Sequence, residues 1–449
     1  MQMNDQADEE MVAGADIGFE AIEGGRGVVM AAEADARGRM SAAAIADRFA
    51  DGVVVALSAA GFGRHAMAEQ GLSLKVLASA VEVERAPAIG EAWRVGLTPV
   101  PVEEGIGFAA ELSDPLMGDV FARGIVEVVS EDANGVHAAF PDDIAERLAE
   151  AAIESAGPAD ALPAGAGVVG NRHCDIMGHM NVQFYGAAFD QACRLLGVGL
   201  GLAEGVVLKP VRSVIRFKAE QRLGDAFQVT SRPTMVAPDA IAVTHELHNL
   251  ETGTLSASVD YVLRPILAGD GSLRPFDDAT METAAMLGAE VVGGIDIGPG
   301  PTEGQGTSFE TYRGSVDPWH CDEHGLVGEQ SLIDRVSCAA GQLLDSVGLS
   351  GERIRRDRIG TAAVEYRIRY EGPARNGDAL TLRSQIAGVR DKVLVLRHRL
   401  SRPGEEATPL LEIDVIAVML DLERRRATQV PADVAARARE LLIEDDAAV

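Results

Sequence analysis

The sequence predicts an α+β protein made of three tandem repeats of one domain, each with a long helix packed on a mostly antiparallel sheet. Its 449 residues leave room for about three domains of roughly 150 residues each. An Asp-bearing loop followed by a helical run occurs three times, and extended, alternating segments follow each run. A hydrophobic share of 47% is enough for each repeat to bury a core.

The repeated loop is the first landmark of each repeat. Segments that begin ADARGRM, CDIMGHM and CDEHGLV each hold an Asp, a Gly three residues later, and then a stretch with helical periodicity. The pairs are Asp35 and Gly38, Asp175 and Gly178, and Asp322 and Gly325. Three matching loops in one chain predict an internal triplication rather than three unrelated domains.

Two further landmarks follow in the same order. The first is a Gly followed by an acid, at Gly90-Glu91, Gly224-Asp225 and Gly377-Asp378. The second is a Pro that opens an Ala- and Glu-rich run, at Pro141, Pro275 and Pro431. Extended runs such as VRSVIRFKAE and AIAVTHELHNL lie between them, and Gly- and Pro-rich linkers lie at 155–167 and 293–306. We therefore expect domains at 1–156, 165–290 and 306–449.

Composition excludes several classes of protein. The net charge of −29 makes the chain a poor ligand for nucleic acid or an anionic membrane surface. The N-terminal MQMNDQADEE is acidic, unlike a signal peptide, and the apolar stretch at 52–62 is far shorter than the roughly 20 residues of a membrane helix. The four cysteines form no CxxC pair, which argues against a metal site. We expect a soluble, cytoplasmic protein that needs no metal or cofactor.

The second repeat carries the most informative motif. Asp175, His179, Asn181 and Tyr185 form D-x3-H-x-N-x3-Y. This motif resembles the active-site loop of hot-dog acyl-CoA thioesterases of the 4-hydroxybenzoyl-CoA type, and that of acyl-acyl-carrier-protein thioesterases. An Arg-Phe pair at 216–217, with Asp225 eight residues after the Phe, is also similar to those families. The fold resemblance covers nearly the whole chain, whereas the loop resemblance covers only 172–186.

The resemblance implies three tandem hot-dog domains and a thioesterase site in the second repeat. Asp175 would attack the thioester or activate water, and amides around Gly178 at the helix start would polarise the thioester oxygen. His179, Asn181 and Tyr185 would complete the catalytic set. Each of these residue types also has a structural interpretation, as a turn, a helix cap, a loop histidine or a core tyrosine.

The other two repeats depart from the motif. The positions of His179, Asn181 and Tyr185 hold Arg39, Ser41 and Ile45 in the first repeat, and Leu326, Gly328 and Leu332 in the third. Only the Asp is present in all three. We therefore expect a single working site and a degenerate first repeat.

A run of basic residues follows the motif. Arg212, Arg216, Lys218 and Arg222 are evenly spaced, which on a strand would place them on one face. Arg216, Lys218 and Arg222, together with Gly178, are expected to bind substrate through the coenzyme A phosphates. The alternative is a solvated sheet face. Arg367 and Arg369 repeat the pattern in the third repeat.

The leading function is hydrolysis of an acyl-CoA or acyl-acyl-carrier-protein thioester. The alternatives are a non-catalytic acyl-thioester binding or scaffold protein, and an enoyl-thioester hydratase that uses His320 and Asp322 of DPWHCDEHG. A nucleophilic Cys174 is disfavoured because Cys321 takes the same place in a repeat without the matching His. Since hot-dog units resemble half-barrels that pair, we expect two repeats to pair within the chain and the third to pair across a two-fold axis, giving a homodimer.

Overall fold

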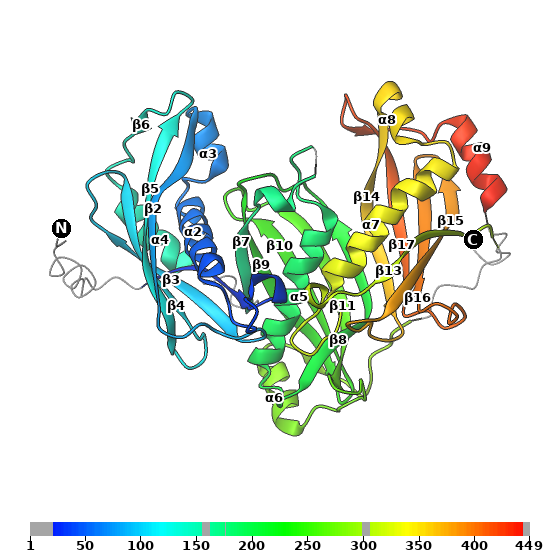
Figure 1. The fold of residues 1–449 in the computed structure, drawn as a ribbon, viewed down its shortest axis with the longest axis horizontal. Coiled ribbons are helices and arrows are strands. Elements are labelled where there is room, and N and C mark those ends of the chain that lie inside the picture. The colour runs from blue at the N-terminus through cyan, green and yellow to red at the C-terminus, as the bar shows by residue number, and fades with distance from the viewer. Residues whose placement is uncertain (1–20, 155–161, 176, 299–305, 443–449) are drawn as a thin grey trace. The chain divides into compact units, whose positions relative to one another are not determined.

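The computed structural model describes residues 21–154, 162–175, 177–298 and 306–442. Figure 1 shows the chain from blue to red. The first repeat comprises β1 (Ile22–Val28), η1 (Ala31–Glu33), α2 (Ala42–Ala59), α3 (Arg64–Glu69), β2 (Leu72–Val83), β3 (Ala92–Val100), β4 (Ile106–Ser113), β5 (Val120–Asp132), β6 (His137–Ala138) and α4 (Ile144–Glu154). The second comprises β7 (Leu162–Val168), η2 (Asn171–His173), α5 (Val182–Gly199), β8 (Val206–Phe217), β9 (Ala226–Ala237), β10 (Ala240–Asn249), β11 (Leu255–Leu267), α6 (Asp278–Met286) and β12 (Glu290–Val291). The third comprises β13 (Phe309–Ser315), η3 (Pro318–His320), α7 (Glu329–Ser346), α8 (Gly351–Asp357), β14 (Ile359–Tyr370), β15 (Ala379–Arg390), β16 (Val393–Ser401), β17 (Leu411–Asp421), β18 (Arg426–Ala427) and α9 (Ala432–Leu441).

Each repeat has the predicted order of a strand, a loop, a long helix and then antiparallel strands, and the loop contains a short 3-10 turn. The long helices α2, α5 and α7 each have 18 residues and bury an apolar stripe, as Phe189, Cys193 and Leu196 do on α5. A helix stripe covering one face of a sheet is a stable two-layer solution. The predicted fold class is therefore confirmed. Within the described part of the chain, no helix is long and apolar enough to span a bilayer.

The described residues fall into two compact units. The first holds most of the first repeat, and the second holds the other two repeats together with the stretches 27–40 and 87–92. The sheet of the first unit has the order β1-β3-β4-β5-β2, with β6 beside β5. The second unit has one continuous sheet, β12-β9-β10-β11-β8-β14-β17-β16-β15-β13, with β7 beside β9 and β18 beside β17. The expected domain boundaries at 1–156, 165–290 and 306–449 stay a prediction.

The second and third repeats pair within the chain, as expected. Strands β8 and β14 run antiparallel, with Arg216 opposite Glu365 and Val214 opposite Arg367. Helices α5 and α7 pack against each other on one face of the joined sheet (Figure 1). Their approach is close, because a Cβ at Gly186 would lie 2.8 Å from Ile333 Cδ1. A local two-fold therefore relates these two repeats.

The Asp-Gly landmark is a turn that has the same structure in every repeat. One carboxylate oxygen of the Asp accepts hydrogen bonds from the amides two and four residues later, at 2.8–3.1 Å. The Gly three residues after the Asp has a φ of 70–74°, the left-handed conformation that glycine tolerates best. The three turns are at Asp35 and Gly38, Asp175 and Gly178, and Asp322 and Gly325. The repeat signature in the sequence is thus, in the first place, turn chemistry.

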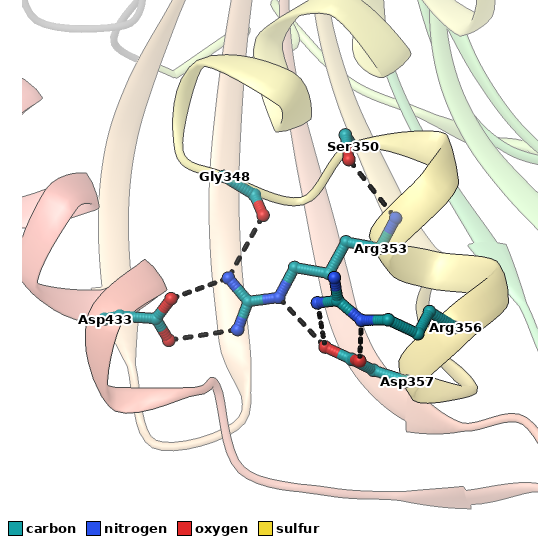
Figure 2. Close-up of polar contacts among 6 residues, drawn as sticks. All are labelled: Gly348, Ser350, Arg353, Arg356, Asp357 and Asp433. Carbon is teal, nitrogen blue, oxygen red and sulfur yellow. Dashed lines mark hydrogen bonds and ion pairs between the residues drawn. The ribbon is translucent and has the colours of Figure 1, made fainter.

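The third repeat has an additional clamp at its C-terminal end (Figure 2). Arg353 of α8 donates to both carboxylate oxygens of Asp433 on α9, at 2.6 and 3.0 Å, and to the Gly348 carbonyl at 3.1 Å. These bonds lower the pKa of Asp433 to about 2. The fork geometry of the guanidinium explains why an Arg holds the two helices together.

Candidate active site

A cavity of about 240 Å³ lies between the second and third repeats. Its polar end gathers Asp190, Lys209, Tyr261, Glu329 and Tyr370. Its apolar wall includes Leu208, Val211, Ile266, Leu273, Leu332, Leu400, Leu410 and Leu411. An apolar body with a few converging polar groups is the usual form of a small-molecule site.

Asp190 brings a carboxylate to this polar end. It lies eight residues after Val182, the first residue of α5, and faces the start of α7. A Cβ at Gly328 would be only 2.9 Å from Asp190 Oδ2, so the carboxylate rests directly on the Gly328 backbone. Burial raises the pKa of Asp190, and the charges of Lys209 and Arg194 oppose that rise. A raised pKa makes a carboxylate a stronger base near neutral pH.

The start of α7 differs from the starts of the other two long helices. Ser41 and Asn181 cap α2 and α5, because their side chains accept from Ala44 N and Gln183 N, each at 3.2 Å. The corresponding residue of α7 is Gly328, which has no side chain with which to cap the helix. The first-turn amides of α7 and the positive end of its dipole therefore remain available beside Asp190. Backbone amides at the positive end of a helix can stabilise an oxyanion.

Glu329, the first residue of α7, is a second acid at this end of the cavity. Only 4% of it is exposed. The hydroxyls of Tyr261 and Tyr370 each donate to one of its carboxylate oxygens, and Ser213 Oγ lies 3.3 Å from Oε1. Burial raises the pKa of Glu329 to about 7, although these hydrogen bonds act in the opposite direction. Glu329 therefore titrates near neutral pH inside a polar network.

We expect Glu329→Gln to make stability less sensitive to pH. Folded Glu329 keeps its proton up to about pH 7, whereas the unfolded residue loses it near 4.5. The folded state therefore binds more protons in this interval, and stability falls as the pH rises through it. Between pH 5 and pH 8, this titration should lower the free energy of unfolding of the wild type by roughly 2–3 kcal/mol. Urea unfolding should show that the free energy of unfolding decreases less from pH 5 to pH 8 in the variant than in the wild type. Equal decreases in the two proteins would contradict the raised pKa of Glu329.

The residues predicted to be catalytic lie around the start of α5. Asp175 is exposed and holds its own turn. His179 Nε2 lies 3.3 Å from Glu220 Oε2, and Asn181 caps α5. Tyr185 is buried, its hydroxyl accepts from Gln221 N at 3.1 Å, and burial raises its pKa to about 12. Asp175 and His179 are joined by the hydrogen bond of the turn, each of the four residues has a structural contact, and their catalytic role stays a prediction.

The local two-fold explains why the two helix starts differ. In the third repeat, the position of Asp190 is occupied by Ser337 and that of Tyr185 by Leu332. The Asp190 position thus has no carboxylate in the third repeat. Near the start of α5, Gln183 instead donates to Asp334 Oδ1 at 2.9 Å, whereas Glu329 at the start of α7 lines the cavity. Sequence reasoning missed Asp190 and Glu329 because acids on helices are ordinary. The sequence signal that could have found them is the difference between the two repeats at matching positions, with Asp190 against Ser337 and Asn181 against Gly328.

The basic residues do not form one stripe along a strand, which corrects the expectation. Strand β8 ends at Phe217, because the chain then turns through 218–224, so Lys218 and Arg222 lie in the loop that follows. Arg216 lies 2.6 Å from Asp260 Oδ2 and 3.3 Å from Glu365 Oε2, contacts that raise its pKa. Lys218 is exposed and Arg222 is 3.9 Å from Glu220. Binding of coenzyme A phosphates by Arg216, Lys218 and Arg222, with Gly178, stays a prediction.

The residues considered for a hydratase mechanism and for a cysteine nucleophile make other contacts in the structure. His320 Nδ1 accepts from Asp317 N at 3.3 Å, whereas Asp322 Oδ2 accepts from Lys209 Nζ at 2.9 Å. Cys174 and Cys321 occupy equivalent positions, and their thiols lie 3.6 and 3.7 Å from the carbonyls of Gly170 and Asp317. Burial raises the pKa of both thiols, to about 11 for Cys321. A protonated thiol is a weak nucleophile, so this geometry favours a structural role for both.

The long helix packed on an antiparallel sheet, with two such units paired through one strand from each, defines the hot-dog class. The family model described as the thioesterase-like superfamily matches residues 169–283 and 316–438, just over half of the chain. The chain therefore belongs to the thioesterase-like superfamily.

Several solved structures are similar to this chain. A putative oleoyl thioesterase from Lactobacillus plantarum is 15% identical, covers 56% of this chain and 94% of its own, and has a TM-score of 0.46. The 12:0-ACP thioesterase from Umbellularia californica is 11% identical, with 56% and 92% coverage and a TM-score of 0.44. The probable thioesterase YbaW from Escherichia coli is 19% identical, with 30% and 98% coverage and a TM-score of 0.27.

Proposed function

We propose that this protein hydrolyses an acyl thioester, carried by coenzyme A or an acyl carrier protein, in the cavity between its second and third repeats. One observation carries the proposal. The Asp190 carboxylate lies against the uncapped start of α7, at the polar end of an apolar cavity. A base beside oxyanion-stabilising amides is what thioester hydrolysis requires. Membership of the thioesterase-like superfamily supports the reaction class.

The proposed reaction places the acyl group on the leucine-rich wall and the thioester oxygen at the first-turn amides of α7. Asp190 takes a proton from a water molecule, whose oxygen bonds to the carbonyl carbon. The amides stabilise the oxyanion until the carbon–sulfur bond breaks and the departing thiolate takes up the proton. The cavity of about 240 Å³ is at the small end of ligand sites, which favours an acyl group of modest size.

The sequence-derived site at Asp175 is a separate proposal for the same reaction. It has the motif in its favour, whereas the Asp190 site has the cavity and the uncapped helix. We further propose that the protein acts as a homodimer in the cytoplasm. The absence of any disulfide among its four cysteines, all within the described residues, fits a reducing compartment.

The test is an acyl-CoA panel assayed for thiol release, with acyl-pantetheine thioesters in parallel. Catalytic release of thiol from at least one acyl group supports the proposed function. Saturable binding without release would instead indicate the scaffold function. Addition of water to crotonyl-CoA without thiol release would indicate a hydratase, and either result would overturn the proposal.

A further inference from the structure

Glu329 is a buried acid that the proposed reaction does not yet use. It lines the polar end of the cavity together with Asp190, and only 4% of it is exposed. Its carboxylate accepts hydrogen bonds from the hydroxyls of Tyr261, Tyr370 and Ser213. Burying a carboxyl group costs free energy, and such groups gather at sites where they act on a ligand. Glu329 is therefore a candidate for a chemical role.

The local two-fold shows that packing alone does not require this acid and its tyrosines. Aligned on the Asp-Gly turns and on the β8–β14, β8–β11 and β14–β17 pairings, each of these residues has a counterpart around the start of α5. The counterparts of Glu329, Tyr370 and Tyr261 are the apolar Val182, Phe217 and Val415. Only Ser213 has a polar counterpart, Tyr366. Since apolar side chains fill the equivalent place, we attribute the acid and its two tyrosines to function.

The surroundings of the two carboxyls assign the proton to Glu329 rather than to Asp190. The groups around Glu329 are Asp190 and Cys193 of α5, Lys209 and Ser213 of β8, Tyr261 of β11 and Tyr370 of β14. Burial raises the pKa of both carboxyls, to about 7 for Glu329. The charges of Lys209 and Arg194 oppose the rise at Asp190, so Asp190 ionises first and Glu329 keeps its proton. Two carboxyls separated in this way can act as an acid and a base.

The place of Glu329 on α7 puts it beside the bond that breaks. It is the first residue of α7, and the first-turn amides of this helix hold the thioester oxygen in the proposed reaction. The sulfur is bonded to the same carbon as that oxygen, so it also lies at this end of the cavity. An alkyl thiolate is a poor leaving group because its thiol has a pKa of about 8.5. An acid that protonates the sulfur lowers this barrier.

We propose that Glu329 is the general acid of thioester hydrolysis and protonates the departing sulfur, while Asp190 acts as the base. This inference rests on the proposed function and assigns its last step. The oxyanion re-forms the carbonyl, the electron pair of the carbon–sulfur bond moves to sulfur, and the sulfur takes the proton of Glu329. The proton that Asp190 took from water then returns to Glu329 through water in the emptied cavity. One water is consumed per thioester, and a carboxylic acid and a thiol are released.

Two thioesters of one acyl group test this assignment in Glu329→Gln. Benzyl thiol and thiophenol are leaving groups of similar size, but the thiophenol anion is the weaker base and leaves without help from an acid. The kcat for the benzyl thioester should fall by roughly 10²–10⁴, the contribution of a positioned acid. The loss for the phenyl thioester should be at least about tenfold smaller. An equal loss for both would overturn the proposal, because it would show that Glu329 only shapes the site.

Glu371→Gln is the matched control. Glu371 also lines the cavity, but Arg369 binds its carboxylate. This variant should change the two rates by the same factor. If the wild type releases thiol from neither ester nor from any acyl-CoA, the proposed function itself is wrong. If it releases thiol and the two esters respond alike to Glu329→Gln, only the role of Glu329 is wrong.

The pH profile of acyl-CoA hydrolysis is a second test. Protonated Glu329 is the active form, so the kcat of the wild type should fall as the pH rises through about 7, and Glu329→Gln should lack this fall. Tyr370→Phe removes one hydrogen bond to the ionised carboxylate, so it should move the fall to higher pH. The ring is retained, as at the equivalent Phe217 of the second repeat. A fall that persists in Glu329→Gln, or stays at the same pH in Tyr370→Phe, would contradict the general-acid role.

Discussion

Replacing Asp190 with Asn should lower the rate of thioester hydrolysis by roughly 10²–10⁴, the usual contribution of a positioned general base. The Asn keeps the shape of the side chain against Gly328 but removes the proton acceptor. Folding should be little affected, because Lys209 keeps its partner Asp322, at 2.9 Å. The measurement is kcat for thiol release, with thermal unfolding as the check on the fold.

Asp175→Asn is the matched comparison, because the motif predicts the same loss there. In the structure, Asp175 is exposed and its Oδ1 accepts from the amides of Met177 and His179. An Asn oxygen can accept the same bonds, so we expect the turn and most of the activity to survive. A large loss for Asp175→Asn with a small loss for Asp190→Asn would place the site at the start of α5 instead.

Gly328→Asn should reduce turnover by roughly 10²–10³, the effect of losing an oxyanion donor. The Gly328 backbone is extended, with φ −80° and ψ 159°, so an Asn there adds no backbone strain. By analogy with Asn181, the new side chain would accept from an amide of the first turn and compete with the substrate oxygen. Its Cβ would also press on Asp190 Oδ2. Thiol-release kinetics should therefore show a loss while the melting temperature changes little.

Gly328→Ala separates these two effects. Alanine has the Cβ that meets Asp190 but no oxygen with which to cap the helix. We expect it to lose less activity than Gly328→Asn if the amides are the main contribution. If the Asn variant keeps wild-type turnover, the start of α7 does not hold the oxyanion and the proposed mechanism is wrong.

The repeat architecture could be predicted because its signals are local. The Asp-Gly turn, the helical periodicity after it and the alternating strands each depend on neighbours within a few residues. The same turn explains why the motif at Asp175 was conspicuous. Asp and Gly recur at 35 and 38, 175 and 178, and 322 and 325 because this turn needs them, whatever chemistry the loop performs.

The sequence by itself therefore determined the three repeats, their helix-on-sheet layers and the pairing tendency of the fold. Only the tertiary structure decided where a cavity opens and which residues meet in it. Asp190 and Glu329 belong to different repeats and come together because β8 pairs with β14 and α5 packs on α7. Neither acid is unusual on its own helix. The site results from burial and from helix pairing between distant segments, which no local pattern in the chain records.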